Sequence, residues 1–527
     1  MGSAQLIASF RTFVRTALWV LTIGAMVSAQ DVLMWHNDAA RTGQNLHESV
    51  LTRANVQAKT FGKLFVITVD GKVDAEPLYV GALQMPNRGA RNVLFVATEH
   101  GSVYALDADS GQEFWRVRLL RAGETTSDNR NCDQITPEIG VTATPVIDRQ
   151  QGPHGVLYAV AMSKDTQGQY RHRLHALDLQ NGVDQLGGPV EITAKYRDTP
   201  AFDAKQYAER AALLLVNRTL YLTWTSHCDI RPYNGWIMAY DARTLQQRSA
   251  LNLTPGGREG AIWQSGAGPA ADGQGNVYVM SANGDFDISL DAGGFPDLGD
   301  FGNSFLKISG VNGRLRVADY FTMFDVEAES KGDDDLGSGG PLVLPDMLDA
   351  RGAVRHLVVG AGKDLNIYLL DREAMGKFNA KRNHVYQEIP KAFQHEFARP
   401  IPAYFNGSLY YATTEDPLRQ YRFRNARLLP EPASHTSIAF VYPGASPSIS
   451  ANGTREGIVW VLENEDPAVL HAYDANDVSR ELYNSDQAPL GRDHFGAGNK
   501  FITPMVANGK VYVGTTDGVG VFGLLSK

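Results

Sequence analysis

The sequence predicts an all-β fold, an eight-bladed β-propeller built from four-stranded blades. Three observations carry this prediction: one short strand pattern recurs eight times, a second strand pattern precedes each copy, and a third segment, usually opening with proline, precedes that one. Runs of alternating apolar residues bounded by turn residues are typical of strands. A succession of short strands repeated along the whole chain is typical of propellers.

One unit is visible at 92–115, where the sequence reads NVLFVATEHGSVYALDADSGQEFW. Leu94 and Val96 in the first run, and Val103 and Ala105 in the second, have the period of two of half-buried strands. His-Gly turns the chain between the runs, and Asp-Ser-Gly turns it again after them, because glycine readily takes a positive φ. The stretch therefore predicts consecutive antiparallel strands.

The other copies define eight units. The third strands are VYALD at 103, LHALD at 174, IMAYD at 237, FLKIS at 305, IYLLD at 367, QYRFR at 420, LHAYD at 470 and VFGLL at 521. The second strands are VLFVAT at 93, VLYAVA at 156, TLYLTW at 219, NVYVMS at 276, HLVVGA at 356, SLYYAT at 408, GIVWVL at 457 and KVYVGT at 510. The first strands are EPLYV at 76, TPVID at 144, ALLLV at 212, GPAAD at 268, GPLVL at 340, IPAYF at 401, SPSIS at 446 and TPMVA at 503. Proline lacks an N–H and suits the inner edge strand of a blade.

The segment after each third strand, such as 115–117, supplies the fourth strand. The last unit has no fourth strand of its own, whereas GKLFVITV at 62–69 precedes the first unit and has no blade. We therefore expect the N- and C-terminal strands to pair in one blade, which leaves the ring without an open seam. The alternative is two four-bladed domains joined by a linker at 332–340.

The N-terminus predicts export. Two arginines precede an apolar run at 16–27, and small residues follow it, as in a secretory signal. An uncleaved anchor is the alternative, although twelve apolar residues are short for a membrane span of about 20. We expect a signal peptide at 1–29, an N-terminal segment packing on the propeller at 30–60, and a single propeller domain at 61–527, in a periplasmic or secreted protein that is soluble after cleavage.

The charge and the missing motifs exclude several classes of partner and of function. The formal net charge of −9 argues against a nucleic acid or an anionic membrane as partner, since either calls for a basic surface. The G-x-S-x-G and H-E-x-x-H motifs that are typical of hydrolases do not occur in the sequence. No C-x-x-C-H motif for a covalent haem occurs either.

The repeat, above all VYALDADSGQEFW, resembles the pyrroloquinoline quinone (PQQ) propeller repeat, and the chain resembles the eight-bladed quinoprotein alcohol dehydrogenase superfamily. The opening WHNDAARTGQN and LTRANV at 51–56 are similar to the N-terminal segment of that superfamily. This resemblance implies a PQQ- and calcium-dependent dehydrogenase of alcohols or sugars. Without a haem of its own, such an enzyme passes its electrons to a separate acceptor.

The resemblance nominates residues for the cofactor. GAIWQSG at 260–266 is similar to the segment whose tryptophan stacks on PQQ, which implies Trp263. GKDLNIYLLDR at 362–372 implies that Lys363 lies near a quinone oxygen. Glu76, just before the first proline strand, is a weaker candidate for a cofactor contact. The alternative for Trp263 is a tryptophan that only packs between blades.

Further segments nominate the metal ligands and the base. SANGDFD at 281–287 resembles the calcium-ligating asparagine segment and implies Asn283. Asp229 stands where the superfamily has a ligating glutamate, as a shorter carboxylate in imperfect register. GDDDLGSGGPLVLPD at 332–346 resembles the loop of the catalytic aspartate and implies Asp335, with Asp333 as runner-up. Asn and Asp are also favoured in turns, and the acidic triplet could be only a solvated turn.

The two cysteines mark a departure from the superfamily, whose dehydrogenases commonly have adjacent cysteines beside the cofactor. Here Cys132 follows Asn131, and the other cysteine is Cys228. Both fall in loops expected on the same face of neighbouring blades, and export favours oxidation, so we expect a Cys132–Cys228 disulfide. Two free thiols are the alternative.

Two classes of function follow. The first is the dehydrogenase, with Trp263, Asn283, Asp335 and Lys363 occurring in the expected chain order. The second is a noncatalytic propeller that serves as a scaffold binding a protein or a glycan, which the missing cysteine pair and the imperfect ligands favour. If those four residues do not converge on one pocket, the enzyme interpretation fails.

Overall fold

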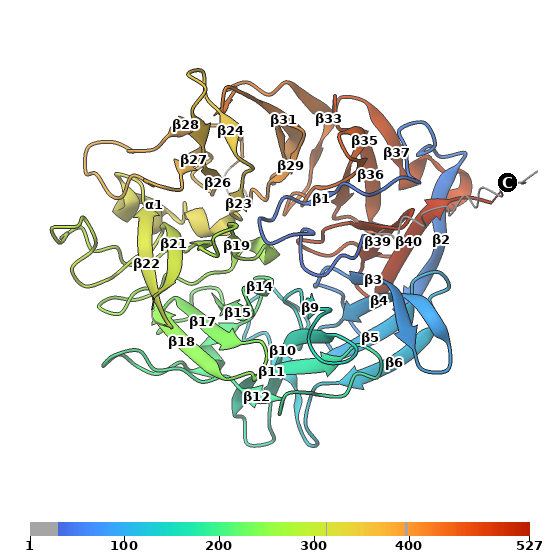
Figure 1. Ribbon diagram of the computed structural model, residues 1–527, viewed down its shortest axis with the longest axis horizontal. Helices are drawn as coiled ribbons and strands as arrows, with labels where there is room; N and C mark the ends of the chain where they lie inside the picture. Colours follow the sequence, from blue (N-terminus) through green and yellow to red (C-terminus); the bar gives the residue numbers. More distant parts are fainter. Residues whose placement is uncertain (1–29, 312, 396–398, 527) are drawn as a thin grey trace, which may run out of the picture.

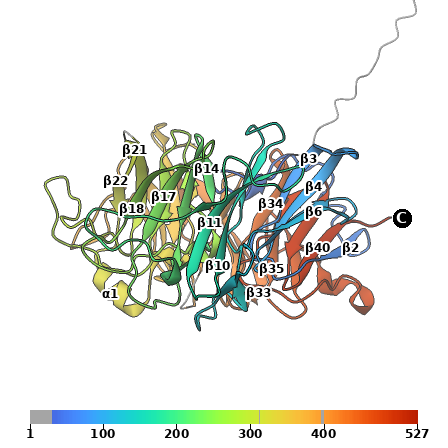
Figure 2. The ribbon, with the colours of Figure 1, turned by 90° about the horizontal axis from the view of Figure 1, so that it is seen from below.

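Eight antiparallel sheets surround one axis in the structure, a computed structural model that describes residues 30–311, 313–395 and 399–526 (Figure 1). The predicted signal peptide at 1–29 lies outside the described residues. Seen edge-on, the sheets form a flat disc (Figure 2). The predicted eight-bladed, all-β architecture is confirmed.

The first four blades, each given from its inner to its outer strand, are built from the following strands. They are β3 (Leu78–Met85), β4 (Gly89–Ala97), β5 (Ser102–Asp107) and β6 (Glu113–Arg118); β9 (Val146–Asp148), β10 (Val156–Lys164), β11 (Tyr170–Asp178) and β12 (Val190–Glu191); β14 (Leu214–Val216), β15 (Thr219–Thr223), β17 (Trp236–Asp241) and β18 (Gln247–Asn252); and β19 (Ala270–Ala271), β20 (Val277–Met280), β21 (Phe305–Val311) and β22 (Arg314–Phe321).

The second four blades follow the same plan. Their strands are β23 (Leu342–Val343), β26 (Leu357–Ala361), β27 (Ile367–Asp371) and β28 (Gln387–Ile389); β29 (Ala403–Phe405), β30 (Ser408–Tyr411), β31 (Asp416–Arg424) and β33 (Ser434–Phe440); β34 (Ser448–Asn452), β35 (Arg455–Glu463), β36 (Val469–Asp474) and β37 (Glu481–Asn484); and β38 (Met505–Ala507), β39 (Lys510–Gly514), β40 (Gly518–Leu524) and β2 (Phe61–Thr68).

Short elements decorate the blades. The extra strands are β1 (Gln44–Asn45), β7 (Thr125–Asp128), β8 (Glu138–Ile139), β13 (Tyr207–Ala208), β16 (Thr225–Ser226), β24 (Met347–Leu348), β25 (Val354–Arg355) and β32 (Arg427–Leu428). The helices are α1 (Val326–Gly332) and the 3-10 turns η1 (Ala204–Gln206), η2 (Gln264–Gly266), η3 (Leu336–Ser338), η4 (Ser485–Gln487) and η5 (Pro489–Gly491). Within the described ranges, none of the helices has the length and apolar character needed to cross a membrane.

The chain ends close the ring. β2 pairs antiparallel with β40, with Phe61 opposite Leu524 and Thr68 opposite Gly518, so the last blade contains strands from both ends of the chain. The predicted closure is therefore confirmed. The two-domain alternative is wrong, because α1 and η3, within and beside 332–340, connect two neighbouring blades of the same ring.

Strand burial differs from the expected half-buried pattern. In β4 and β5, Leu94, Phe95, Val103 and Tyr104 are all buried, although successive side chains point to opposite faces. Each blade packs between two neighbours, so both of its faces are covered. Phe95 and its counterparts form the apolar contact between blades that holds the ring together.

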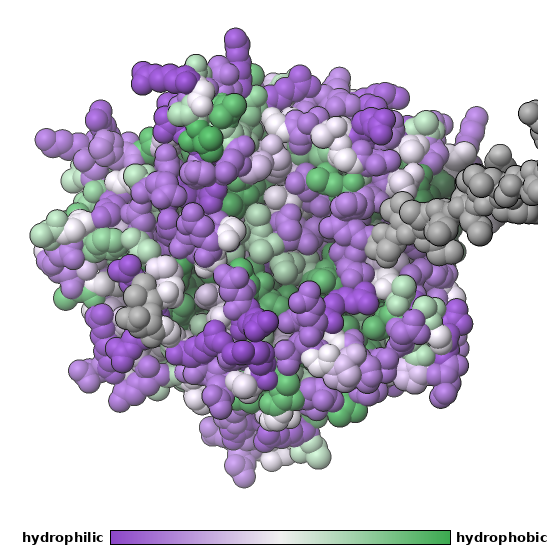
Figure 3. Space-filling view, viewed as in Figure 1, coloured by the Kyte–Doolittle hydropathy of each residue, from purple (hydrophilic) through white to green (hydrophobic). Residues whose placement is uncertain are grey.

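Residues 32–45, called here the hub segment, cross the middle of the ring (Figure 1). Hydrogen bonds join this segment to every blade. They run from Tyr79 N to Val32 O, from Ile147 N to Leu33 O, from Arg41 Nη2 to Leu213 O, from Ala271 N to Ala39 O, from Val343 N to Ala40 O, from Tyr404 N to Thr42 O, from Ile449 N to Gly43 O and from Asn45 Nδ2 to Val506 O. The hub segment thus contacts the inner edge of all eight blades. In the same view, apolar residues gather near the middle of the disc (Figure 3).

Candidate functional site

A cavity of about 230 Å³ lies among the loops of the disc. Its lining residues all come from two kinds of connection, from the outer strand of one blade to the inner strand of the next, or from the second to the third strand of a blade. In an antiparallel blade these connections emerge on the same face. The lining includes Asp229, Trp263, Asn283, Asp333, Asp335 and Lys363, and also Cys132, His227, Cys228, Arg210, Arg399 and Phe501.

The centre of the cavity wall is an ion-pair cluster. Lys363 Nζ lies 2.7 Å from Asp335 Oδ1 and 2.7 Å from Asp333 Oδ1. Asn283 Nδ2 donates to Asp333 Oδ1 at 2.6 Å. Asp335 and Lys363 have side-chain exposures of 1% and 7%, whereas Asp333 is half exposed. Three of the four residues that the enzyme interpretation required are thus within one hydrogen-bonded group.

The local backbone brings these residues together. Asp333 ends α1 with a left-handed φ of 66°, which turns the chain back into the cavity. Leu336 N donates to Asn303 Oδ1, and Lys363 N donates to Asp335 O at 3.1 Å. Gly362 allows this approach, because a Cβ at that position would lie 2.6 Å from Asp335 O.

Burial and charge set the protonation of the pair. Burial raises the pKa of Asp335, while the charge of Lys363 lowers it in part; Asp333 and Asp229 add to the rise. Burial by itself lowers the pKa of Lys363, but the carboxylates of Asp335 and Asp333 outweigh it, so this pKa is raised. Lys363 therefore stays charged at neutral pH, and Asp335 is a stronger base than an exposed aspartate.

Two oxygens at this cluster lack a partner. Asp335 Oδ2 and Asn283 Oδ1 are buried atoms without a hydrogen bond. Buried polar atoms are nearly always satisfied, so such orphans indicate a missing ligand, ion or water. A carboxylate oxygen and an amide oxygen are the donors that Ca²⁺ prefers, so the residues fit a calcium ion. Among the described residues, no group of three or more His, Cys, Asp or Glu side chains is arranged to hold a metal, so any cation here needs Asn283 and ligand oxygens as well.

Asp229 lines the same cavity. Its Oδ1 accepts from Ser226 Oγ at 3.1 Å and from the Tyr233 hydroxyl. Its negative charge also contributes, after burial and the charge of Asp333, to the raised pKa of Asp335. The structure therefore brings Asp229 to the cavity, although its role as a metal ligand stays a prediction.

Trp263 supplies an aromatic surface to the cavity. Its ring meets Phe501 edge-on at 5.9 Å between centroids, and the Arg399 guanidinium carbon lies 5.7 Å from its centroid. The indole is half-buried. A planar ligand in the cavity would therefore find an aromatic partner, as the stacking prediction requires.

Glu76 lies elsewhere. It is buried and is not among the residues that line the cavity; its Oε2 accepts from His36 N in the hub segment at 2.9 Å. Burial raises the pKa of Glu76 to about 8, opposed by the His36 N–H and the charge of Arg41. The contact of its carboxylate thus goes to the hub segment, and the structure does not bring Glu76 to the other predicted site residues.

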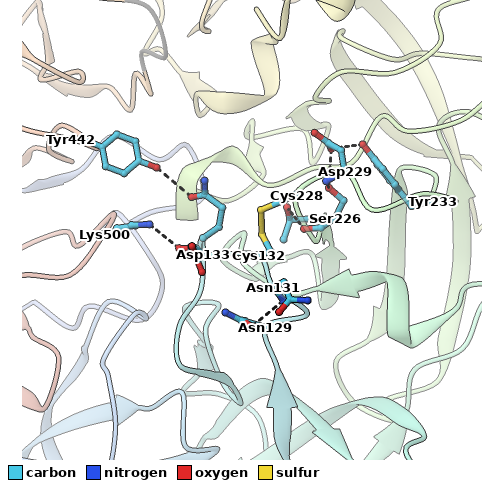
Figure 4. The surroundings of a disulfide bond; sticks show 12 residues. Asn129, Asn131, Cys132, Asp133, Ser226, Cys228, Asp229, Tyr233, Tyr442 and Lys500 are labelled. Carbon is cyan, nitrogen blue, oxygen red and sulfur yellow. Dashed lines mark hydrogen bonds between the residues drawn. A yellow bond between two sulfur atoms is a disulfide. The ribbon is translucent and has the colours of Figure 1, made fainter.

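The two cysteines form the predicted disulfide. Cys132 and Cys228 have Cα atoms 5.5 Å apart and are bonded, so the alternative of two free thiols is wrong. Figure 4 shows the bond joining the loop of Asn129, Asn131 and Asp133 to the loop of Ser226 and Asp229. Both cysteines line the cavity, so the bond forms part of its wall.

Several residues near the cavity were not predicted from the sequence. Arg210 lines it, donates to Thr142 O and Lys500 O, and lies 3.7 Å from Asp74. Asp74 in turn contacts the buried Glu99, whose pKa burial raises far above its usual range, with further help from the charge of Asp74. No local motif marks these residues, because their partners come from other blades.

Comparison with known proteins supports the fold. No family model matches the chain, and no curated protein matches it. Among solved structures, quinohemoprotein alcohol dehydrogenase from Comamonas testosteroni matches 94% of this chain and 80% of its own, with 14% identity and a TM-score of 0.61. Quinohemoprotein alcohol dehydrogenase ADHIIG from Pseudomonas putida HK5 matches 94% and 81%, with 14% identity and a TM-score of 0.60.

A third neighbour is a europium-containing methanol dehydrogenase, which matches 95% of this chain and 99% of its own, with 12% identity and a TM-score of 0.61. The chain thus has the eight-bladed fold of the quinoprotein alcohol dehydrogenases, which confirms for the fold the resemblance seen in the repeat. At this level of identity the likeness concerns architecture, so the chemistry has to come from the cavity.

Proposed function

We propose that this protein is an exported oxidoreductase of the quinoprotein type, which binds PQQ and a calcium ion in the cavity and oxidises an alcohol or a sugar. The observation that carries the proposal is that Trp263, Asn283, Asp335 and Lys363 line one cavity, with two buried oxygens still unpartnered. A bound PQQ would supply the two-electron acceptor for the hydride of the substrate.

Each residue has a separate task in this proposal. The ring of Trp263 packs against the planar cofactor, and Asn283 Oδ1 provides an oxygen to the cation. Asp335 Oδ2 accepts the hydroxyl proton of the substrate as the hydride leaves. Lys363 holds Asp335 in position through Oδ1, so that only Oδ2 faces the substrate, and its positive charge offsets the cost of burying the carboxylate.

The setting of the chain agrees with export. The predicted signal at 1–29 would direct secretion, and the Cys132–Cys228 disulfide would persist in an oxidising compartment. Electrons would leave to a separate carrier, because the sequence has no C-x-x-C-H motif.

The proposal is tested by titrating the mature protein with PQQ and calcium, following cofactor absorbance and heat. Europium is a second probe for the cation, since one structural neighbour contains it. We expect saturable, cation-dependent binding that Trp263→Ala and Asn283→Ala each weaken at least tenfold. Trp115→Ala is the matched control, because Trp115 is a half-buried tryptophan on β6 and does not line the cavity.

Turnover is measured next, with alcohols and sugars and an artificial electron acceptor. Asp335→Asn should retain cofactor binding and lose turnover by at least a hundredfold, the scale of a lost general base. If the wild-type protein binds neither cofactor nor cation, the dehydrogenase proposal fails, and the propeller is then a scaffold whose partner is a protein or a glycan.

A further inference from the structure

The Cys132–Cys228 disulfide occupies a particular place in the cavity wall. Cys132 belongs to the connection at 129–139 between the first two blades, and Cys228 belongs to the connection at 225–233 within the third blade. Each connection contributes several further residues to the cavity lining. The bond therefore joins two adjoining parts of the wall whose cysteines lie 96 residues apart.

Both connections have unusual backbone conformations next to the bond. Arg130 and Asn131 have φ of 53° and 62°, and Cys228 and Asp229 have φ of 45° and 57°. Asn and Asp adopt this left-handed region more readily than other residues with a β-carbon, whereas Arg130 and Cys228 are of types that seldom do and that hold it where the surroundings enforce it. Two such pairs, each including or adjoining a bonded cysteine, indicate that the cross-link helps to enforce the shape of the wall.

Other contacts fix the outer ends of the same loops. Arg130 Nη1 donates to Lys205 O at 2.7 Å, and Lys500 Nζ donates to Asp133 O at 2.8 Å (Figure 4 shows the second contact). Asp229 is held within its own loop, by Ser226 and Tyr233. The first two bonds thus tie the 129–139 loop to residues outside both loops, and the contacts of Asp229 lie within its own loop, whereas the disulfide joins the two loops to each other.

We propose that formation of the Cys132–Cys228 disulfide completes the cavity wall, so that the oxidised protein captures its ligand and the reduced protein does not. Cys228 is exposed and Cys132 is buried, so a thiol in solution attacks the Cys228 sulfur. Opening the bond frees the loop that bears Asp229 to relax from its left-handed backbone. The ligand part of this inference rests on the proposed function, whereas the wall part does not.

The redox step is a thiol–disulfide exchange. A dithiol reductant gives two electrons and two protons to the Cys132–Cys228 bond, which becomes two thiols, while the sulfurs of the reductant become a disulfide. Oxidation of the exported chain runs in the opposite direction, with a protein disulfide as the oxidant. Because the chain has two cysteines in all, this bond is the one disulfide that a reductant can open.

The test measures hydrogen–deuterium exchange of the mature protein before and after treatment with a dithiol, at a temperature well below unfolding. Thiol titration should rise from zero to two per chain. We expect exchange to accelerate at least tenfold in peptides covering 129–139 and 225–233, with the blade strands unchanged. The Cys132→Ser/Cys228→Ser variant should show the fast exchange from the start and should not respond to the dithiol.

Calcium and PQQ titrations follow on the same samples. We expect the affinity to fall at least tenfold on reduction and to return when the bond is reoxidised, a recovery that irreversible damage to the fold would not show. Unchanged exchange in both loops after thiol release overturns the inference, as does faster exchange throughout the blades. Faster loop exchange with unchanged affinity overturns only the part of the inference that concerns ligand capture. Absence of binding in the oxidised protein refutes the proposed function. The exchange result then still decides the role of the disulfide in the cavity wall.

Discussion

The buried ion pair of Lys363 and Asp335 yields the sharpest stability prediction. Lys363→Met keeps a side chain of similar length and removes the charge. Asp335 then loses the ammonium that lies 2.7 Å from its Oδ1, and its Oδ2 already lacks a partner. Removing one member of a buried ion pair costs about 3–5 kcal/mol, because the remaining charge is uncompensated.

This loss of unfolding free energy corresponds to a lower melting temperature. Unfolding entropy is about 2.1 cal/mol/K per residue, or about 1 kcal/mol/K for a chain of roughly 500 residues, so Lys363→Met should lower Tm by about 3–5 °C. Lys363→Met/Asp335→Asn should recover most of this loss, because replacing both charges with neutral groups is often close to neutral. Exposed Lys331, at the end of the neighbouring α1, provides the control, and Lys331→Met should change Tm by less than about 1 °C.

The assay is scanning calorimetry at two scan rates, which reveals irreversible unfolding, supported by urea midpoints. The double variant should be nearly as stable as the wild type and yet fail to turn over substrate. A Tm of Lys363→Met equal to that of the wild type would refute the buried pair. A double variant as unstable as the single variant would refute the electrostatic reasoning.

Two further predictions concern the hub. Gly43→Ala should lower Tm more than Gly89→Ala. Both glycines have φ of 70°, but a Cβ at Gly43 would lie 2.9 Å from the His36 ring, whereas nothing lies within 4 Å of a Cβ at Gly89. Equal losses of Tm in calorimetry would contradict this prediction. Glu76 has a folded pKa of about 8, raised by burial, so its contribution to stability is full below the unfolded value of 4.5 and is lost as pH rises through about 8. Glu76→Gln should therefore gain urea stability relative to the wild type between pH 5 and pH 9, and parallel curves for the two proteins would show that Glu76 does not titrate in this range.

The fold could be read from the sequence because its information is local and repeated. Each blade needs four short strands and tight turns, and the eight copies provide many independent observations of the same pattern. The closure of the ring was predictable because the last unit lacks a fourth strand, whereas one strand at 62–69 precedes the first unit and belongs to no other blade. The path of the hub segment could not be read in this way, because its contacts go mostly to backbone groups of inner strands, which leave no side-chain pattern.

The candidate site was predictable where one loop carries a recognisable motif. Trp263, Asn283, Asp335 and Lys363 come from such loops, and the structure brings all four to one cavity. Arg210 was missed, because its partners come from the loops of other blades. The position of Glu76 before the first strand predicts a cofactor contact, but its carboxylate accepts a hydrogen bond from His36 N in the hub segment instead.

The ion-pair cluster around Lys363 also favours the dehydrogenase over the noncatalytic scaffold. Burying Lys363 with Asp335 is weak evidence of a gain in stability, because apolar residues of similar size generally serve a core as well or better. A scaffold that binds partners through its rim has no need of an unpartnered Asp335 Oδ2 or an unpartnered Asn283 Oδ1 inside a cavity. In the proposed function a cation and an alcohol would give both atoms partners, and that is the physical reason to test cofactor binding before searching for a protein or glycan partner.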